Sequence, residues 1–439
     1  MGFRRLCYFI ITIMVVLLVL AGCNYNFSGL SEGSEEEYVV SEEEAQTLAE
    51  LNNEFALSFY EHLPEEGNLV YSPYSVYTAL SMLYAGTGTE TRDIVGEKLG
   101  SYEFDTDDDF YSANGALRGE LMDLNGENYE VNVGNSFWGD QTYEDDFQED
   151  YFDLLEKYFS ARVDVLDLKS DSEKSRQIIN DWIEDQTNDL IQEMLKKGQI
   201  DDLSVFYLVN AVYFLGPWEE EFDKKKTEET EFNLADDSTE EVSMMKAKRN
   251  YPYYDARGGE DGKDYKALEI PYKDERAKML FVMPTGDNSL TNLEEELDRE
   301  ELEFIRNNLE KVYDEESFED EEHKPGIPVH IPKFEIETDI NLNSSFIDYD
   351  LGMLYDFEES DFSGIIKGSQ NNFAVSDALH SAVIKVDEEG TEAAGATVIE
   401  MIETAEPPQF IADRPFLYFV IEEESEAIIF MGRYTGPEN

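Results

Sequence analysis

The stretch Val386–Phe416, VDEEGTEAAGATVIEMIETAEPPQFIADRPF, decides how the rest of the chain is interpreted. Between Glu389 and Glu400 it consists mostly of Gly, Thr and Ala, and such a run of small residues indicates a poor helix and an exposed loop. If the stretch is extended, however, every second residue lies on the same face, and one of the two faces carries no charge before Glu403. Because an unpaired charge is costly to bury, this alternation predicts a loop that can enter a β-sheet as a strand.

The two faces of this stretch differ in charge. The uncharged face consists of Thr391, Ala393, Gly395, Thr397, Ile399 and Met401. The opposite face consists of Glu392, Ala394, Ala396, Val398 and Glu400. A plain surface loop has no need of such a pattern, so the first face is expected to be the one that turns inward.

Seven further short motifs lie outside this stretch, and an eighth, ADRPF, lies at its C-terminal end. They are Asn68 with Ser72-Pro73 and Ser75, Leu208–Phe214 leading to Gly216 and Trp218, Val242 with Met244-Met245, Leu268–Tyr272 (LEIPY), Ile331–Phe334 (IPKF), Asp361–Gly364 (DFSG), Ala412–Phe416 (ADRPF) and Phe430–Arg433 (FMGR). Together with Glu388–Thr397 they resemble, in order, the motifs of the serpin family from about residue 45 to Pro437. The sequence departs from that pattern at Thr187–Ile191, which we interpret as drift within a helix.

The resemblance implies the serpin fold: mixed α and β, with three β-sheets, about nine helices and an exposed reactive-centre loop. Length alone would suggest two domains. The resemblance instead implies a single domain at 45–439 with the reactive loop at 388–411, and no linker composition divides the chain after residue 45. A monomer is expected.

The implied function is inhibition of serine proteases, not catalysis. A target protease attacks the loop and forms an acyl-enzyme, and the cut loop then inserts into the main sheet as a new strand. Counting from the hinge, the cleaved bond is expected at Thr404-Ala405, with Glu403-Thr404 as the alternative. A small polar residue before the bond suits an elastase-like or subtilisin-like pocket and argues against a trypsin-like target.

The resemblance also assigns residues that control insertion. The hinge comprises Glu388, Gly390, Thr391, Glu392, Ala393, Ala394, Gly395, Ala396 and Thr397. The breach, at the top of the sheet, comprises Glu388, Lys333 and Trp218, with an ion pair expected between the first two. The shutter, under the middle of the sheet where strands must part, comprises Ser72, Ser75, Asn210 and His380.

Two alternatives stay open for the function. A non-inhibitory serpin would act as a surface binding or structural lipoprotein, although a bulky or charged residue at Thr391 or Ala393 would be expected in that case. An unrelated hydrolase would pair His380 with Ser72 or Ser75, but no acidic residue that orients the histidine can be assigned, which favours a buried hydrogen-bonded histidine.

No metal or cofactor is expected. Asp105–Asp109 resembles the start of a calcium loop, but Phe110 stands where such a loop needs Gly, which favours a solvated acidic loop. The sequence holds no Walker loop, dinucleotide fingerprint, HExxH or GxSxG motif. Asn26 and Asn343 each begin a glycosylation sequon, which is a weak signal.

The charge of the chain excludes a nucleic-acid partner of the usual kind. The 439 residues include 33 Lys plus Arg and 100 Asp plus Glu, for a formal net charge of −67, whereas phosphate binding needs a basic face. Because the carboxylates run along the whole chain, a surface adapted to high salt is favoured over a field that steers a cationic partner. We therefore expect a halophilic protein.

The first 22 residues predict export. Arg4 and Arg5 precede the apolar run Tyr8–Leu20, and the following Leu20–Cys23 (LAGC) resembles the lipobox of secreted lipoproteins, in which Cys23 is lipid-modified. An uncleaved membrane anchor is the alternative, although the run is short for a span of about 20 residues. In both cases the rest of the chain is expected outside the cell, anchored to the outer face of its membrane.

Cysteine usage narrows the chemistry of the exported part. The other cysteine of the chain, Cys7, lies inside the signal segment. No disulfide, zinc thiolate or thiol nucleophile is therefore expected beyond Cys23. Residues 23–44 are acidic and polar, with Ser and Gly, and are expected to form an extended tether.

Apolar periodicity predicts the local structure of the folded part. Helices are expected at 43–62, from Ser72 to about Gly86, and at 148–159, 174–196 and 293–309. Strands are expected at 130–138, 205–214, 267–270, 279–283, 329–334, 382–386 and 417–421.

Overall fold

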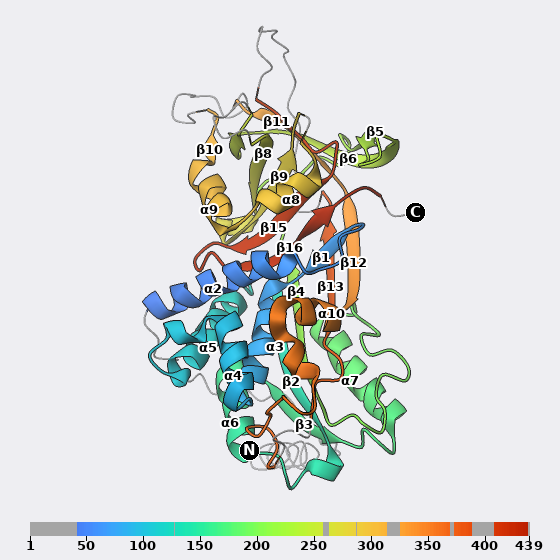
Figure 1. Cartoon of the computed structure of the whole chain (residues 1–439). Helices are drawn as coiled ribbons and strands as arrows, with labels where there is room; N and C mark the ends of the chain where they lie inside the picture. The colour runs from blue at the N-terminus through green and yellow to red at the C-terminus, as the bar shows by residue number, and fades with distance from the viewer. Residues whose placement is uncertain are drawn as a thin grey trace, which may run out of the picture. The chain divides into compact units, whose positions relative to one another are not determined.

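The computed structural model describes residues 42–126, 128–257, 263–286, 288–313, 325–368, 373–388 and 408–437 (Figure 1). All of them belong to one compact unit, which spans Tyr38–Asn439. The α-helices of this part are α2 (Glu42–Tyr60), α3 (Pro73–Ala85), α4 (Thr89–Leu99), α5 (Asp107–Asp123), α6 (Glu149–Phe159), α7 (Ser172–Gln186), α8 (Leu290–Glu296), α9 (Arg299–Asn308) and α10 (Asn343–Phe346). No helix among the described residues is long and apolar enough to cross a membrane.

The strands of the described residues form four hydrogen-bonded sheets. The seven-stranded sheet has the order β1 (Leu69–Tyr71), β16 (Ile428–Tyr434), β15 (Phe416–Glu422), β9 (Ala277–Pro284), β8 (Tyr265–Pro271), β7 (Pro252–Asp255) and β10 (Glu310–Lys311). The four-stranded sheet has the order β14 (Phe410–Ile411), β11 (Ile327–Pro332), β6 (Thr239–Arg249) and β5 (Glu228–Asn233). The third sheet pairs β3 (Arg162–Leu166), β2 (Glu130–Asp140) and β4 (Phe206–Leu215), and the fourth pairs β12 (Phe334–Asn341) with β13 (Leu379–Val386).

Helix α3 is the central helix of the fold. Ser72 caps its first turn by accepting a hydrogen bond from the backbone N–H of Ser75, and Pro73 occupies the first helical position, where its missing N–H costs nothing. Most of its residues are buried on all sides, because the helix packs against β16 on one side and β4 on the other. The seven-stranded sheet and the β3-β2-β4 sheet therefore meet at this helix.

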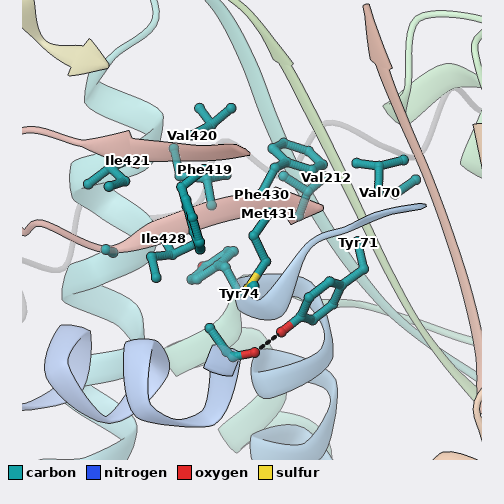
Figure 2. Close-up of a cluster of buried hydrophobic side chains, with 14 of the residues drawn as sticks. Val70, Tyr71, Tyr74, Val212, Phe419, Val420, Ile421, Ile428, Phe430 and Met431 are labelled. Atoms are coloured by element: carbon teal, nitrogen blue, oxygen red, sulfur yellow. Dashed lines mark hydrogen bonds between the residues drawn. The ribbon is translucent and has the colours of Figure 1, made fainter. Parts of the chain in front are cut away.

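Strands β9, β15 and β16 are buried along their whole length. Figure 2 shows side chains from β15 and β16, among them Phe419 and Phe430, packed with Val212 of β4 and Tyr74 of α3. In the same view the Tyr71 hydroxyl donates a hydrogen bond to the carbonyl of Ala56, which ties β1 to α2. Strands covered on both faces form mostly apolar runs, and this pattern predicts β9 and β15. Apolar periodicity does not predict β16, which contains Gly432 and Arg433.

A second, smaller core lies outside this main one. Helix α7 covers the β3-β2-β4 sheet through Ile179 and Ile183, which cluster with Trp138 of β2 and with Tyr207 and Val209 of β4. Alternate residues of β4 thus contribute to two different cores. The β3-β2-β4 sheet is therefore covered on both faces, by α7 and by α3.

Two predicted helices end earlier than expected. Helix α7 stops at Gln186, so the interpretation of Thr187–Ile191 as drift within a helix is wrong: Asn188 and Asp189 have positive φ angles of 50° and 63°, and the chain turns away there. The predicted helix at 293–309 is two helices, because Asp298 caps α9 by accepting a hydrogen bond from the N–H of Glu301.

A close approach of two strands explains one motif glycine. A side chain at Gly432 of β16 would place its Cβ against the carbonyl oxygen of Leu69 in β1 and 2.6 Å from the hydroxyl of Tyr418. That hydroxyl already donates a 2.8 Å hydrogen bond to the same carbonyl. The FMGR motif therefore needs a glycine at this position for packing.

Gly432→Ala is expected to lower the free energy of unfolding by about 2 to 3 kcal/mol, since backbone atoms must move to admit the methyl group. Gly119→Ala is the matched control, because no atom lies within 4 Å of the place that an alanine methyl group would take and alanine favours the helix α5. Denaturant unfolding monitored by circular dichroism measures both. Equal stabilities of the two variants would contradict the close-approach explanation.

Candidate functional site

The base of the expected reactive loop is held by a buried carboxylate. Glu388 lies two residues beyond the end of β13 and is only 4% exposed. One of its oxygens lies 2.6 Å from the Nζ of Lys333, and the other accepts a 2.6 Å hydrogen bond from the hydroxyl of Thr227. Lys333 stands between β11 and β12, and Thr227 precedes β5, so this carboxylate connects three separate parts of the chain.

The environment of Glu388 favours its charged form. Burial alone would raise the pKa of the carboxyl, but the contacts with Lys333 and Thr227 outweigh burial and lower the pKa below its usual value. Lys333 is 37% exposed, so solvent screens the pair and its net contribution to stability is about 0 to 1 kcal/mol. The pair therefore fixes the position of the loop base more than it stabilises the fold.

Trp218 completes the breach. Its indole N–H donates a 2.9 Å hydrogen bond to the carbonyl of Asp387, directly before Glu388. The indole ring stacks on Tyr272 with centroids 4.6 Å apart and an interplanar angle of 11°. The structure thus brings together all three residues of the breach, at the point where β13 ends.

Three of the four shutter residues form one hydrogen-bonded group. The Nε2 of His380 accepts a 3.1 Å hydrogen bond from the backbone N–H of Ser72, whose hydroxyl donates to the carbonyl of Ile429 at 2.7 Å. The same hydroxyl accepts from the N–H of Ser75. This group joins β13, α3 and β16, so parting the strands at this point must disturb all three elements.

His380 is neutral in the folded chain. Burial lowers the pKa of its imidazole to about 4, and the nearby carboxylate of Asp339 opposes this shift only in part. Since Nε2 accepts a hydrogen bond, the proton of the neutral ring sits on Nδ1. The structure leaves no hydrolase pair at these described residues, because the histidine contacts the backbone of Ser72 and not its hydroxyl.

Asn210 of β4 forms a separate pair. Its Nδ2 donates a 2.5 Å hydrogen bond to the Oδ1 of Asn135 in β2, and the Nδ2 of Asn135 donates to the carbonyl of Phe159. The Oδ1 of Asn210 is buried without a hydrogen-bond partner among the described residues. Asn210, Ser75 and His380 nevertheless line the same cavity, and Ser72 is hydrogen-bonded to both Ser75 and His380.

Strands β4 and β13 run side by side in the same direction. Their first residues, Phe206 and Leu379, line one cavity, and beyond their last residues the hydrogen bond from Trp218 to Asp387 joins them again. Figure 1 shows β13 in orange beside β4 in green. Among the described residues the two strands belong to separate hydrogen-bonded sheets. The fold class is as expected, but one of its three expected sheets is divided here.

The backbone groups that face this division can be assigned from the register. In β4 the carbonyl of Val205 accepts from the N–H of Asp140, so alternate residues including Leu208 direct their backbone polar groups away from β2 and toward β13. In β13 the carbonyl of Ala378 accepts from the N–H of Leu342, so Ser381 and its alternate neighbours face β4. We call the space between these two edges the strand slot.

Several predicted residues lie outside the described part of the chain. These are the hinge residues Gly390, Thr391, Glu392, Ala393, Ala394, Gly395, Ala396 and Thr397, the bond residues Thr404 and Ala405, and Cys23. Among the described residues no group of three acidic or sulfur or histidine side chains fits a metal ion.

Two weaker sequence signals have structural explanations. Thr106 caps α5, which begins at Asp107, so the acidic run at 105–109 forms the start of a helix. The amide of Asn343 donates to the carbonyl of Ser376 and accepts from the N–H of Ala378, so its sequon serves the fold.

Sequence reasoning missed Thr227 and Asn135. Thr227 follows three lysines in an acidic segment, and nothing in that pattern marks it as a contact of the loop base. Asn135 carried a usable signal, since Gly134-Asn135-Ser136 places polar residues in a strand that is buried from Val133 to Asp140. A polar residue at a buried strand position needs a partner, and that need points to Asn210.

Comparison with known proteins agrees with this architecture. A family model described as "Serpin (serine protease inhibitor)" matches residues 50–437. The leukocyte elastase inhibitor of Equus caballus is 32% identical over 400 residues, which cover 89% of this chain and 100% of that protein. Antithrombin-III of Homo sapiens is 31% identical over 399 residues, which cover 89% of this chain and 82% of that protein.

Two further relatives extend the comparison. An uncharacterized serpin-like protein of Methanosarcina mazei is 29% identical over 402 residues, which cover 89% of this chain and 88% of that protein. The crystal structure of maspin superposes with a TM-score of 0.75 at 22% sequence identity, over 90% of this chain and 100% of that chain. The fold is that of a large mixed α/β domain with a divided main sheet. The chain belongs to the serpin family.

The neutral state of His380 predicts a pH dependence. Its pKa is about 4 in the folded chain and about 6.5 when unfolded, so its stabilising effect is complete above pH 6.5 and is lost as the pH falls toward 4. The loss of stability amounts to about 3 kcal/mol.

His380→Gln keeps an acceptor for Ser72 and should remove this part of the pH dependence. Denaturant unfolding at pH 7.5 and 4.5 measures the difference, with His62→Gln as the control outside the shutter. Parallel pH profiles for the His380→Gln variant and the unmodified chain would contradict the prediction.

Proposed function

We propose that the chain is a single-use inhibitor of serine proteases that traps its target by inserting the cleaved loop into the strand slot. The observation that carries this proposal is the slot itself: β4 and β13 run parallel, present backbone edges to each other without a shared ladder, and meet the base of the loop at Glu388. A segment that leaves the end of β13 and turns back would run antiparallel to both neighbours.

The cleavage step follows from the expected loop sequence. The hydroxyl of the protease's serine attacks the carbonyl of Thr404, and Ala405 leaves as a new amino terminus. Before water hydrolyses the acyl-enzyme, the segment from Gly390 onward enters the slot and carries the protease with it. The uncharged face that begins at Thr391 would turn toward α3 and the core.

Insertion is favourable because the slot leaves bonds unmade. Each backbone hydrogen bond that the new strand forms contributes about 0.5 to 1.5 kcal/mol, and burial of the apolar face adds to this. The barrier lies in the groups that hold the strands in place, namely the pair Lys333–Glu388 at the breach and the hydrogen bonds of His380 and Ser72 at the shutter. The slot thus supplies the driving force for insertion, and these contacts delay insertion.

The target is proposed to be an elastase-like or subtilisin-like protease. Thr404 before the bond fits a shallow pocket, and the relative from Equus caballus is named as an elastase inhibitor. A non-inhibitory serpin is the second candidate function. Whether the cleaved loop inserts into the sheet decides between the two candidates.

The surroundings are proposed to be the outer face of a cell membrane at high salt. Support comes from the LAGC sequence at Leu20–Cys23 and from the net charge of −67. Burial raises the pKa of Glu120 to about 7, and repulsion by the carboxylates of Glu422, Glu424 and Asp123 makes a smaller contribution. Salt screens such repulsion between surface charges.

Mixing the chain with subtilisin or elastase in molar salt should give a complex that survives a denaturing gel, with a C-terminal peptide that starts at Ala405 by mass spectrometry. Thr391→Arg should give cleavage without complex, because its charge would be buried. Glu392→Arg is the matched control on the opposite face and should still form the complex. If clean cleavage of the unmodified chain leaves its melting temperature unchanged, the loop does not insert and the chain is a non-inhibitory serpin.

The melting temperature should rise steeply with salt, and the fold should be lost below roughly 0.1 M, where the screening length is about 10 Å. Potassium chloride compared with sucrose at equal osmolality separates charge screening from solvent exclusion. A melting temperature that does not depend on salt would remove the halophilic assignment.

Replacement of Cys23 by serine should release the expressed chain from the membrane fraction into the medium, since the lipid attachment point is lost. Detergent phase partitioning of the two forms measures this. Retention of the Cys23→Ser variant in the membrane would instead indicate that the apolar segment Tyr8–Leu20 stays as an uncleaved anchor.

A further inference from the structure

The connection between α7 and β4, residues 187–205, is fixed to both of these elements. The backbone N–H and carbonyl of Leu195 form two 2.9 Å hydrogen bonds with the side-chain amide of Asn180 in α7. The same carbonyl accepts a 2.8 Å hydrogen bond from the guanidinium of Arg176. Farther along, the hydroxyl of Tyr207 in β4 donates a 3.0 Å hydrogen bond to a backbone carbonyl of the connection. The connection, which we call the strap, is therefore held to α7 and β4.

The strap covers the outer side of the strand slot. Three of its side chains are buried with alternate residues of β4 in the smaller core, namely Ile191, Leu195 and Ile200. Leu379 and Val383 of β13 pack against the same core. The intervening His380 points to the opposite face, where it contacts Ser72 at the start of α3. The strap thus lies over both edges of the slot, on the side away from α3.

An ion pair joins the strap to the strands beyond the slot. The Nζ of Lys196 lies 2.8 Å from one carboxylate oxygen of Asp339 in β12. The other oxygen accepts a hydrogen bond from the hydroxyl of Ser381, the residue of β13 that pairs with Asp339 in the ladder. Burial alone would raise the pKa of Asp339, but its contacts with Lys196 and Ser381 lower the pKa below its usual value. The carboxylate is therefore charged.

Insertion of a strand must stretch this contact. Neighbouring strands lie about 4.8 Å apart, so a strand placed between β4 and β13 separates them by about that added distance. The strap stays with α7 and β4, whereas Asp339 moves with β13, because β12 and β13 are paired along their whole length. An added separation of this size exceeds the range of about 4 Å within which an ion pair keeps its contact. The pair between Lys196 and Asp339 must therefore open when the slot opens.

We propose that Lys196 and Asp339 form a clasp across the strand slot, which slows insertion of the cleaved loop and makes the insertion rate depend on salt. This inference rests on the proposed inhibitory function. The two side chains are 55% and 41% exposed, so dissolved ions screen their attraction. The clasp holds in dilute salt and is weak in molar salt, where the screening length is about 3 Å.

The clasp is a control point separate from the breach. It lies near the start of β13, at Ser381, whereas Lys333 and Glu388 meet beyond the end of that strand. Insertion competes with hydrolysis of the acyl-enzyme, so a faster insertion traps more of the protease. The clasp would thus make trapping most efficient at the high salt proposed for the surroundings of the chain.

Lys196→Met keeps the apolar stem of the side chain and removes its charge. After mixing with saturating subtilisin in about 0.3 M potassium chloride, this variant should insert its loop about two- to five-fold faster than the unmodified chain, the effect of one exposed ion pair. In about 3 M salt the two rates should agree. Stopped-flow tryptophan fluorescence follows insertion, because Trp218 lies beside the loop base. Equal rates in the dilute salt would overturn the proposal.

Two further variants show whether the contact itself sets the rate. Lys197→Met is the matched control, since Lys197 is the next residue and is exposed, and it should leave the rate unchanged at both salt concentrations. Asp339→Asn keeps an acceptor for Ser381 and should speed insertion by the same factor as Lys196→Met. The double variant should be no faster than either single one. Additive accelerations, or an equal acceleration in Lys197→Met, would contradict a clasp between these two residues.

Hydrogen exchange separates failure of the clasp from failure of the proposed function. In the uncleaved chain, Lys196→Met should raise the exchange rate of the β13 amides beneath the strap about two- to five-fold in dilute salt. If the chain traps no protease and cleavage does not raise its melting temperature, the proposed function fails. Faster exchange in the variant would then still establish that the ion pair holds the slot closed, and unchanged exchange would overturn the clasp as well.

Discussion

The edge between β4 and β13, which no ladder joins among the described residues, is the constraint on which the rest of this structure depends. The two parallel strands direct backbone donors and acceptors toward each other without forming ladder hydrogen bonds between them. Such an arrangement survives only if surrounding packing prevents the strands from rearranging. Helix α3 beneath the slot and α7 above the β4 sheet provide this packing through two separate cores.

The polar groups around the slot are arranged to hold it at defined points. At one end a buried carboxylate, that of Glu388, is fixed by Lys333 and Thr227. In the middle, His380 accepts from the backbone of Ser72. Both contacts are local and can be exchanged for others, in contrast to an apolar core, where any displacement opens a void. A sheet that opens once and closes again, as the proposed insertion requires, is better held by such contacts.

Much of the fold follows from the sequence for identifiable reasons. Strands β9 and β15 are buried along their whole length and therefore appear as mostly apolar runs, and the helix after Ser72-Pro73 carries its own capping signal. The sequence pattern did not predict where α7 ends, because the positive φ angles at Asn188 and Asp189 depend on the turn that follows. Apolar residues beyond it, such as Ile191, continue the helical pattern while packing from a loop.

By itself the sequence determined the family, the candidate residues of hinge, breach and shutter, and the acidic character of the surface, since these depend on residue types in a fixed order. Only the tertiary structure decided that Thr227 shares the carboxylate of Glu388, that Asn210 pairs with Asn135 and not with His380, and that Asn210 and His380 line one cavity. The reason is physical: such contacts join segments tens to hundreds of residues apart, and no local pattern records which partner a polar side chain meets once the strands are packed.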